Sequence, residues 1–127
     1  MKNVMSKVWE VLRVILALFI IVGGIKHFST PSFYFPFVPD FLVYKLAIIY
    51  VSGVVEILFG LLLLINKYKS LGALAVLVLM LAFLPIHIWD VFSDTPAIGS
   101  HTAALIRLPI QLVLIAISFK LRRLYTK

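Results

Sequence analysis

The sequence predicts an all-α membrane protein with four transmembrane helices. Of its 127 residues, 63% are hydrophobic and 13% are charged, and the mean hydropathy is +1.13. A soluble domain is about 45–50% apolar and about 25% charged, so one small core could not bury this much apolar surface. A helix that crosses the hydrocarbon layer needs about 20 residues. The length therefore fits four spans with short connections, and we expect no separate soluble domain.

Four long apolar stretches define the expected helices. They cover residues 7–26, 41–65, 71–89 and 102–119, and each is long enough to span a bilayer. Uninterrupted runs of this kind exclude a transmembrane β-barrel, whose strands alternate over about ten residues. The first stretch is not followed by a small-residue cleavage site, so we expect it to remain as a helix. Residues 1–127 should form a single antiparallel bundle.

The basic residues predict the orientation of this bundle. Nine of the twelve fall on the side that holds both expected termini and the connection after residue 65: Lys2, Lys7, Arg13, Lys67, Lys69, Lys120, Arg122, Arg123 and Lys127. The other side has Lys26, Lys45 and Arg107. Cytoplasmic segments of membrane proteins carry the excess of Lys and Arg. We therefore expect a multi-pass protein of the cytoplasmic (inner) membrane with both termini in the cytoplasm.

We interpret the net charge of +7 as a signal of membrane topology that also gives the protein some affinity for anionic lipid headgroups, so we expect no nucleic-acid partner. Arg13, one or two turns into the first helix, is expected to extend towards the cytoplasmic headgroups.

The connection from Phe28 to Asp40 predicts a cap at the outer interface. It contains three prolines and five aromatic residues, so it cannot continue a helix and is too apolar for a free aqueous loop. Pro31 and Pro39 each suit the first turn of a helix. We expect a short interfacial helix at Pro31 and the entry to the second span at Pro39. The segment is either a plain aromatic belt or a lid over a site.

Polar residues at membrane depth are the candidate site residues, because each is costly there and tends to face the bundle interior. Glu56 lies about 15 Å along the second span, close to the midplane. In the fourth span, Gln111 is expected at the level of Glu56, with a hydrogen bond between them directly or through water. Arg107 should lie one turn nearer the outer surface, at about the depth of His27 and His87.

These five residues predict a polar funnel that opens to the outer face. Glu56, Gln111, Arg107, His87 and His27 are the candidates for ligand binding and proton exchange, and no catalytic residue or metal site is assigned. The alternative is that they are interhelical hydrogen-bonding groups without a ligand. His101 is a weaker candidate, because a histidine near the interface can simply be hydrated.

Several short motifs resemble the DoxX-like family of small four-helix membrane proteins. They are Gly24-Ile25-Lys26-His27-Phe28 with Pro31, Phe37-Val38-Pro39-Asp40-Phe41-Leu42, Ser52-Gly53-Val54-Val55-Glu56-Ile57-Leu58-Phe59-Gly60, Pro85, and Arg107-Leu108-Pro109-Ile110-Gln111. The resemblance implies a four-span protein in a superfamily named after a membrane subunit of a thiosulfate:quinone oxidoreductase. One position differs, since His87 stands where the family commonly has a neutral amide.

Two functions remain open at this point. In the first, the funnel binds a quinone or another small amphipathic molecule, and the protein is a membrane subunit or accessory of a quinone-linked redox complex. A soluble or membrane redox protein would then carry the electrons, because the chain lacks cysteine and shows no credible haem or cluster site. In the second, it is a non-enzymatic assembly or interaction factor. Whether it has catalytic activity is left open.

Overall fold

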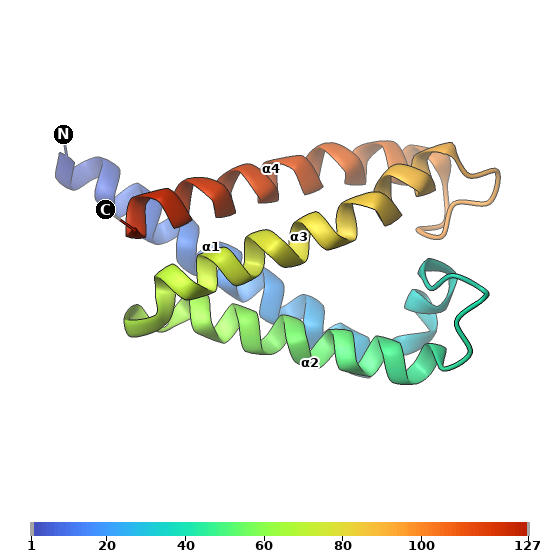
Figure 1. The fold of residues 1–127 in the computed structure, drawn as a ribbon. Helices are drawn as coiled ribbons and strands as arrows, with labels where there is room; N and C mark the ends of the chain where they lie inside the picture. Colours follow the sequence, from blue (N-terminus) through green and yellow to red (C-terminus); the bar gives the residue numbers. More distant parts are fainter. Residues whose placement is uncertain (1, 127) are drawn as a thin grey trace.

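A computed structural model describes residues 2–126, with side chains described from residue 4 onwards. Four long helices follow one another along the chain (Figure 1): α1 (Lys2–Ser29), α2 (Lys45–Leu64), α3 (Lys69–Phe92) and α4 (His101–Tyr125). Two short 3-10 helices connect them, η1 (Pro31–Phe37) before α2 and η2 (Asn66–Tyr68) after it. No strand occurs in the described part of the chain. The expected all-α fold is confirmed.

The four long helices are long and apolar enough to cross a membrane. Many large apolar side chains lie on their outer faces, among them Ile15, Val51 and Val113, which are 58%, 62% and 56% exposed. In water such a surface would be a large apolar patch, whereas a bilayer solvates it. Inside the helices the backbone groups bond to each other, as the hydrocarbon layer requires. The protein is therefore a membrane protein.

The helix boundaries differ from the expected ones mainly at the outer connection. A short helix does begin at Pro31, as expected. Pro39 does not open the second span, because it lies in a turn in which the Leu42 amide donates to the Pro39 carbonyl. Helix α2 begins only at Lys45. At the other end of the chain, α4 continues past residue 119 to Tyr125.

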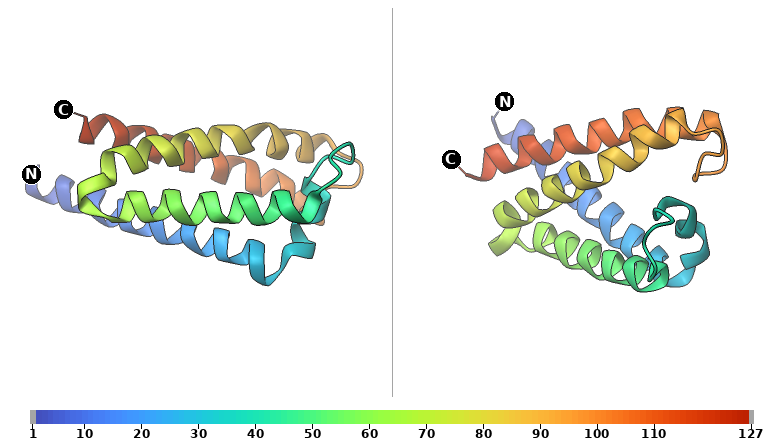
Figure 2. Two further views of the ribbon diagram at one scale, coloured as in Figure 1. Left: turned by 60° about the horizontal axis from the view of Figure 1, so that its bottom comes forward. Right: turned by 45° about the vertical axis from the view of Figure 1, so that its right-hand side comes forward.

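The helices form two hairpins that diverge towards η1. Helix α1 packs along α2, α3 packs along α4, and the α2–α3 contact joins the hairpins. Figure 2 shows the hairpins close together near the termini and apart at the end where η1 lies. The main apolar core includes Leu16 and Ile20 of α1, Leu63 of α2, Val76 of α3 and Leu121 of α4. The hairpins are therefore farther apart at the end where η1 lies than near the termini.

Glycines let α1 and α2 approach each other closely near Glu56. A Cβ atom on Gly24 would lie 2.7 Å from the Gly53 carbonyl oxygen and 2.8 Å from Ile57 Cγ1. A Cβ atom on the neighbouring Gly23 would meet only the Glu56 Oε1 atom, at 3.3 Å. Both glycines lie in the interior of α1 but differ in how closely they approach α2, so substitutions at the two positions can be compared directly.

Gly24→Ala is expected to destabilise the protein by about 1–3 kcal/mol, because the new methyl group pushes against the backbone of α2. Gly23→Ala should be neutral or slightly stabilising, since alanine favours a helix by about 1 kcal/mol over glycine and the Glu56 side chain can shift. Thermal unfolding in detergent measures both. Equal stability of the two variants would contradict the close approach of the helices.

Arg13 does not extend to the headgroups, so that expectation is wrong. Its side chain is buried, and its guanidinium donates to the carbonyl oxygens of Leu63 and Leu64 at 2.9 and 2.8 Å and to Asn66 Oδ1 at 2.9 Å. The last carbonyls of a helix have no partner within it, and the five donors of arginine can serve several of them at once. Arg13 therefore caps the end of α2.

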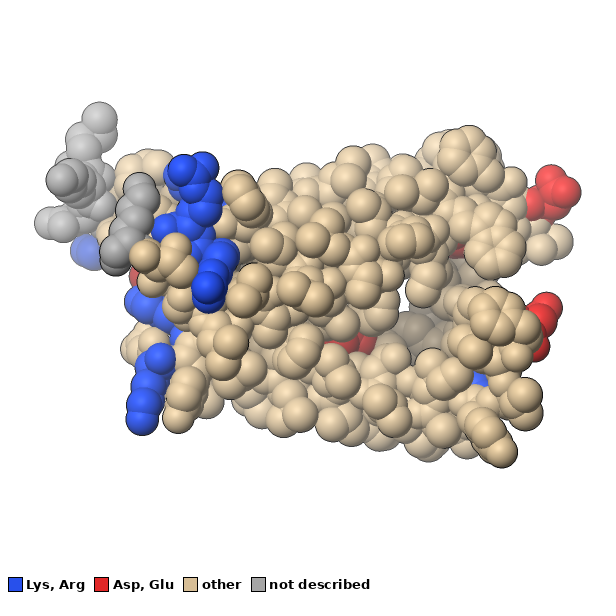
Figure 3. Space-filling view, in the orientation of Figure 1, with Lys and Arg blue, Asp and Glu red and all other residues tan. Residues whose placement is uncertain are grey.

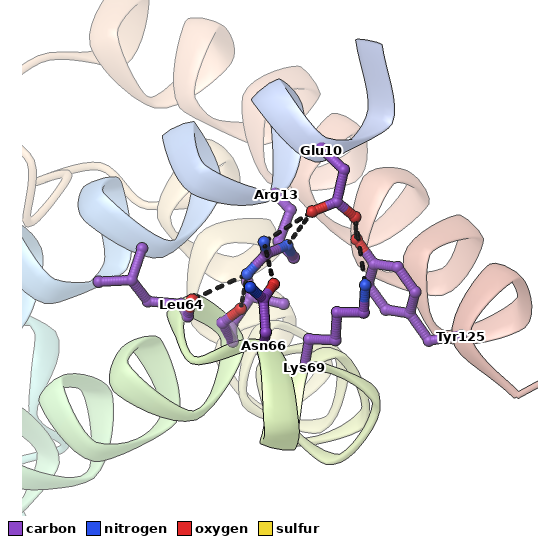
Figure 4. Close-up of polar contacts among 7 residues, drawn as sticks. Glu10, Arg13, Leu64, Asn66, Lys69 and Tyr125 are labelled. Carbon is purple, nitrogen blue, oxygen red and sulfur yellow. Dashed lines mark hydrogen bonds and ion pairs between the residues drawn. The ribbon is translucent and has the colours of Figure 1, made fainter. Parts of the chain in front are cut away.

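Glu10 extends this network to the other helices (Figure 4). Its carboxylate accepts from Arg13 at 2.6 Å and from the Tyr125 hydroxyl at 2.8 Å, and lies 3.5 Å from Lys69 Nζ. The contacts connect α1 to α2, α3 and α4 at the end that holds the termini. We call Glu10, Arg13, Asn66, Lys69 and Tyr125 the terminal clasp. It fixes the hairpins together at one end and leaves their other ends separate.

Candidate functional site

A cavity of about 490 Å³ lies between the two hairpins where they diverge. Its walls come from α1, η1, α2, α3 and α4, and most of the lining side chains are apolar. In Figure 3 the surface is hollowed on the side of the bundle, between α2 and α3 near η1, and away from the end where the basic residues gather. The hollow faces sideways rather than along the helix axes. In a membrane this side faces lipid.

Four of the five predicted residues line this cavity, each from a different helix. His27 comes from α1, Glu56 from α2, His87 from α3 and Arg107 from α4. The fold thus brings together residues that are up to 80 positions apart in the sequence.

Gln111 is not among the lining residues, and its expected direct hydrogen bond to Glu56 is not formed. The Gln111 side chain is fully buried, and its Nε2 donates to the Met80 carbonyl at 2.8 Å. Helix α4 packs on α3 rather than on α2, so the amide faces α3. Depth along the helix, from which the bond was expected, does not indicate which neighbouring helix a polar side chain meets.

His27 and Glu56 form a buried pair that holds one proton. Each residue is 7% exposed, and His27 Nε2 lies 2.7 Å from Glu56 Oε2. His27 Nδ1 lies 2.8 Å from the Ile49 carbonyl oxygen, which can only accept, so Nδ1 carries a hydrogen. At 2.7 Å two lone pairs would repel each other, so the contact requires a proton on Nε2 or Oε2, although it is bent and falls short of regular hydrogen-bond geometry. The pair is neutral as a unit, whichever atom holds that proton.

Aromatic side chains of η1 cover both histidines. The Tyr34 ring lies 4.1 Å from the His27 ring and the Phe37 ring lies 6.2 Å from the His87 ring, measured between centroids. Burial raises the pKa of the Tyr34 hydroxyl, so the phenol stays protonated at neutral pH. These contacts favour a lid over the site rather than a plain aromatic belt. The sequence did not single out Tyr34, because its position depends on how η1 folds back over the bundle.

The other side of the cavity has polar atoms without partners. Among the described residues, Arg107 makes no hydrogen bond or ion pair, and His87 Nδ1 is buried without a hydrogen-bond partner. Asp90, one turn from His87, is already engaged by the backbone amides of Ala97 and Ile98. Buried polar groups are nearly always hydrogen-bonded. Arg107 and His87 are therefore the donors that a ligand can use.

No group of three or more His, Cys, Asp or Glu residues that could hold a metal ion occurs among residues 2–126. The chemistry that the cavity residues offer is hydrogen bonding, charge and proton exchange. An apolar space with a few convergent polar groups is the usual form of a small-molecule site.

Comparison with known protein families gives a match that covers most of the chain. The model of a family described as a domain of unknown function (DUF8561) matches residues 16–122, which include every residue of the cavity. The chain belongs to this family. Neither a curated protein nor a solved structure is similar enough to match. The DUF8561 match thus covers the site without assigning it a function.

Proposed function

We propose that this protein binds a small, lipid-soluble amphipathic molecule of the quinone class in the cavity between its hairpins. The observation that carries the proposal is the proton-sharing His27–Glu56 pair, which faces the unpartnered donors Arg107 and His87 across an apolar space. Quinone carbonyl oxygens accept hydrogen bonds, and quinone chemistry exchanges protons, so both sides of the cavity suit such a head group. The sideways opening suits a molecule that enters from the lipid.

In the cell, the protein would serve as a membrane subunit or accessory of a quinone-linked redox complex. This part of the proposal rests on the resemblance to DoxX-like proteins and on the kind of ligand the cavity fits. The chain contains no cysteine, so a partner protein would supply the electron-carrying group. The role of this chain would be to bind and orient the quinone and to hold a proton at the His27–Glu56 pair.

The competing proposal is an assembly factor whose buried polar residues are structural. Two of the polar residues support it: Gln111 binds the Met80 carbonyl, and Arg13 caps α2. Arg13 is satisfied within the protein, and so is the Nε2 donor of Gln111, whereas the buried Gln111 Oε1 atom has no hydrogen-bond partner among the described residues. Arg107 and His87 differ from both because they line the cavity and make no hydrogen bond within the described protein, and this difference favours a ligand.

A pair of bulky substitutions tests whether the cavity binds the ligand. Ser52 lies on α2 one turn before Glu56 and lines the cavity, whereas Val51 is 62% exposed on the outer face. Ser52→Phe should fill part of the space and weaken binding of a quinone with a short isoprenoid tail by about tenfold or more, since about 1.4 kcal/mol of lost contact suffices for this. Val51→Phe should bind like the parent. Titration calorimetry in detergent measures both affinities, and equal binding by the two variants would reject the cavity as the site.

The orientation of the protein is also a proposal, and it rests on the basic end of the bundle (Figure 3). Both termini and η2 should face the cytoplasm, and η1 should face the outside. The chain has no natural cysteine, so single cysteines can be placed at the exposed Ser32 in η1 and the exposed Lys67 in η2. In intact cells an impermeant thiol reagent should label only the first, and both after the membrane is opened. Labelling of the second in intact cells would reverse the topology.

A further inference from the structure

We infer that the ligand carries an acidic oxygen, which is held in ionised form by Arg107 and His87. This inference rests on the proposed ligand site and specifies the chemical class of its occupant. The inference predicts that the cavity prefers an amphipathic molecule with an anionic head group to a neutral molecule of the same shape.

The first argument is the balance of charge around the cavity. Glu56 is the sole acidic residue among the described lining residues, and it shares a proton with His27, so that pair is neutral. Arg107 keeps its charge at any physiological pH, and Lys26 also lines the cavity. The lining therefore has a net positive charge beside a largely apolar wall. An unpaired charge in such a place is costly, and an anionic ligand would compensate it.

The second argument is the arrangement of donors. Arginine presents a planar fork of N–H groups that matches a carboxylate, a phosphate or the two oxygens of an ionised hydroxyquinone. The His87 Nδ1 atom has no partner in the described protein and can present an N–H to the same oxygen. Both side chains come from the α3–α4 hairpin. The His27–Glu56 pair on the other hairpin is left to meet the rest of the head group.

Two probes that differ by one acidic proton test the inference. The first is an alkylated hydroxynaphthoquinone, whose enol is ionised near neutral pH, and the second is its methyl ether, which has the same ring and chain but stays neutral. Titration of the full-length protein in detergent at neutral pH should give an affinity for the ionised probe at least tenfold higher than for the ether.

Variants then assign the preference to a residue. Arg107→Gln should lose most of the tenfold preference, and Arg107→Lys should keep a part of it, because the charge remains but the fork is lost. Arg123→Gln is the control, since Arg123 is exposed at the opposite end of α4. The parent protein alone already tests the charge preference, so the inference does not depend on the folding of a variant.

The outcomes separate this inference from the proposed function. Equal affinity for both probes in the parent would overturn the acidic head group and leave the amphipathic site in place. Failure of both probes to bind would overturn the site itself. Retention of the full preference by folded Arg107→Gln would show that Arg107 is not the anchor, and would overturn the assignment as stated.

Discussion

Replacing Glu56 with glutamine should leave the fold intact and weaken binding of a quinone probe by about 10- to 100-fold. The glutamine amide can still donate to His27 Nε2, so packing and hydrogen bonding are preserved. The exchangeable proton and the adjustable charge are lost. A hydrogen bond that involves a charged group contributes about 1.5–3 kcal/mol, which corresponds to the stated loss of affinity.

Glu56→Leu separates the binding role from a structural one. Leucine cannot bond to His27, so the buried Nε2 atom is left unpaired, at a cost of about 1–3 kcal/mol in stability. Thermal unfolding in detergent should therefore rank Glu56→Gln close to the parent and Glu56→Leu below it, while both lose the ligand. If both variants retained full binding or complex activity, the site assignment would be lost and the assembly proposal would take its place.

The second large effect is expected at the terminal clasp. Arg13→Met should destabilise the protein by about 3 kcal/mol, because it removes one partner of a buried network and leaves the carbonyls of Leu63 and Leu64 and the Asn66 side chain without their donor. This value is at the low end for a buried ion pair, since the Glu10 side chain is 40% exposed. Denaturant unfolding in mixed micelles measures the loss.

A matched substitution controls for the removal of a positive charge at this end. Arg123→Met removes an exposed arginine and should change stability by about 0.5 kcal/mol or less. Arg13→Lys should lie in between, since one ammonium group cannot serve so many acceptors. Equal stability of Arg13→Met and Arg123→Met would mean that Arg13 is not a structural cap.

The sequence predicts the helices well because their signal is local. Each span is an apolar run, and its length shows that it can cross a bilayer as a helix. Pro31 begins η1, as expected for a proline in the first turn of a helix. Pro39 misled the prediction, since a proline that suits a first turn also suits an ordinary turn. Helix α2 begins only at Lys45, after the turn that Pro39 starts.

The sequence predicted four polar residues that line the cavity, but not the contacts that they make. Charged and titratable groups at membrane depth are rare and face inwards, so Glu56, His27, His87 and Arg107 could be named in advance. The partners of these groups depend on which helices are neighbours, and the sequence does not encode this in any short pattern. Glu56 therefore meets His27 rather than Gln111.

The prediction for Arg13 was wrong for the same reason, since its partners depend on which helices are neighbours. From the sequence alone, an arginine near a helix end is expected to extend its side chain to the lipid headgroups. In the fold, the carbonyls of Leu63 and Leu64 and the Asn66 side chain lie within its reach, and these acceptors are 50 or more residues away in sequence. A buried cap of this kind is visible only in three dimensions.

The most direct test is to identify what the protein carries out of its own membrane. The parent, Ser52→Phe and Val51→Phe are released from native membrane in polymer-bounded lipid discs, and the small molecules that remain with each are identified by mass spectrometry. The parent and Val51→Phe should retain one lipid-soluble molecule with a quinone-type, acidic head group, in about equal amounts, and Ser52→Phe should not. The same bulk lipids in all three, with no additional molecule in the parent, would contradict the proposal that this protein is a ligand-binding membrane subunit.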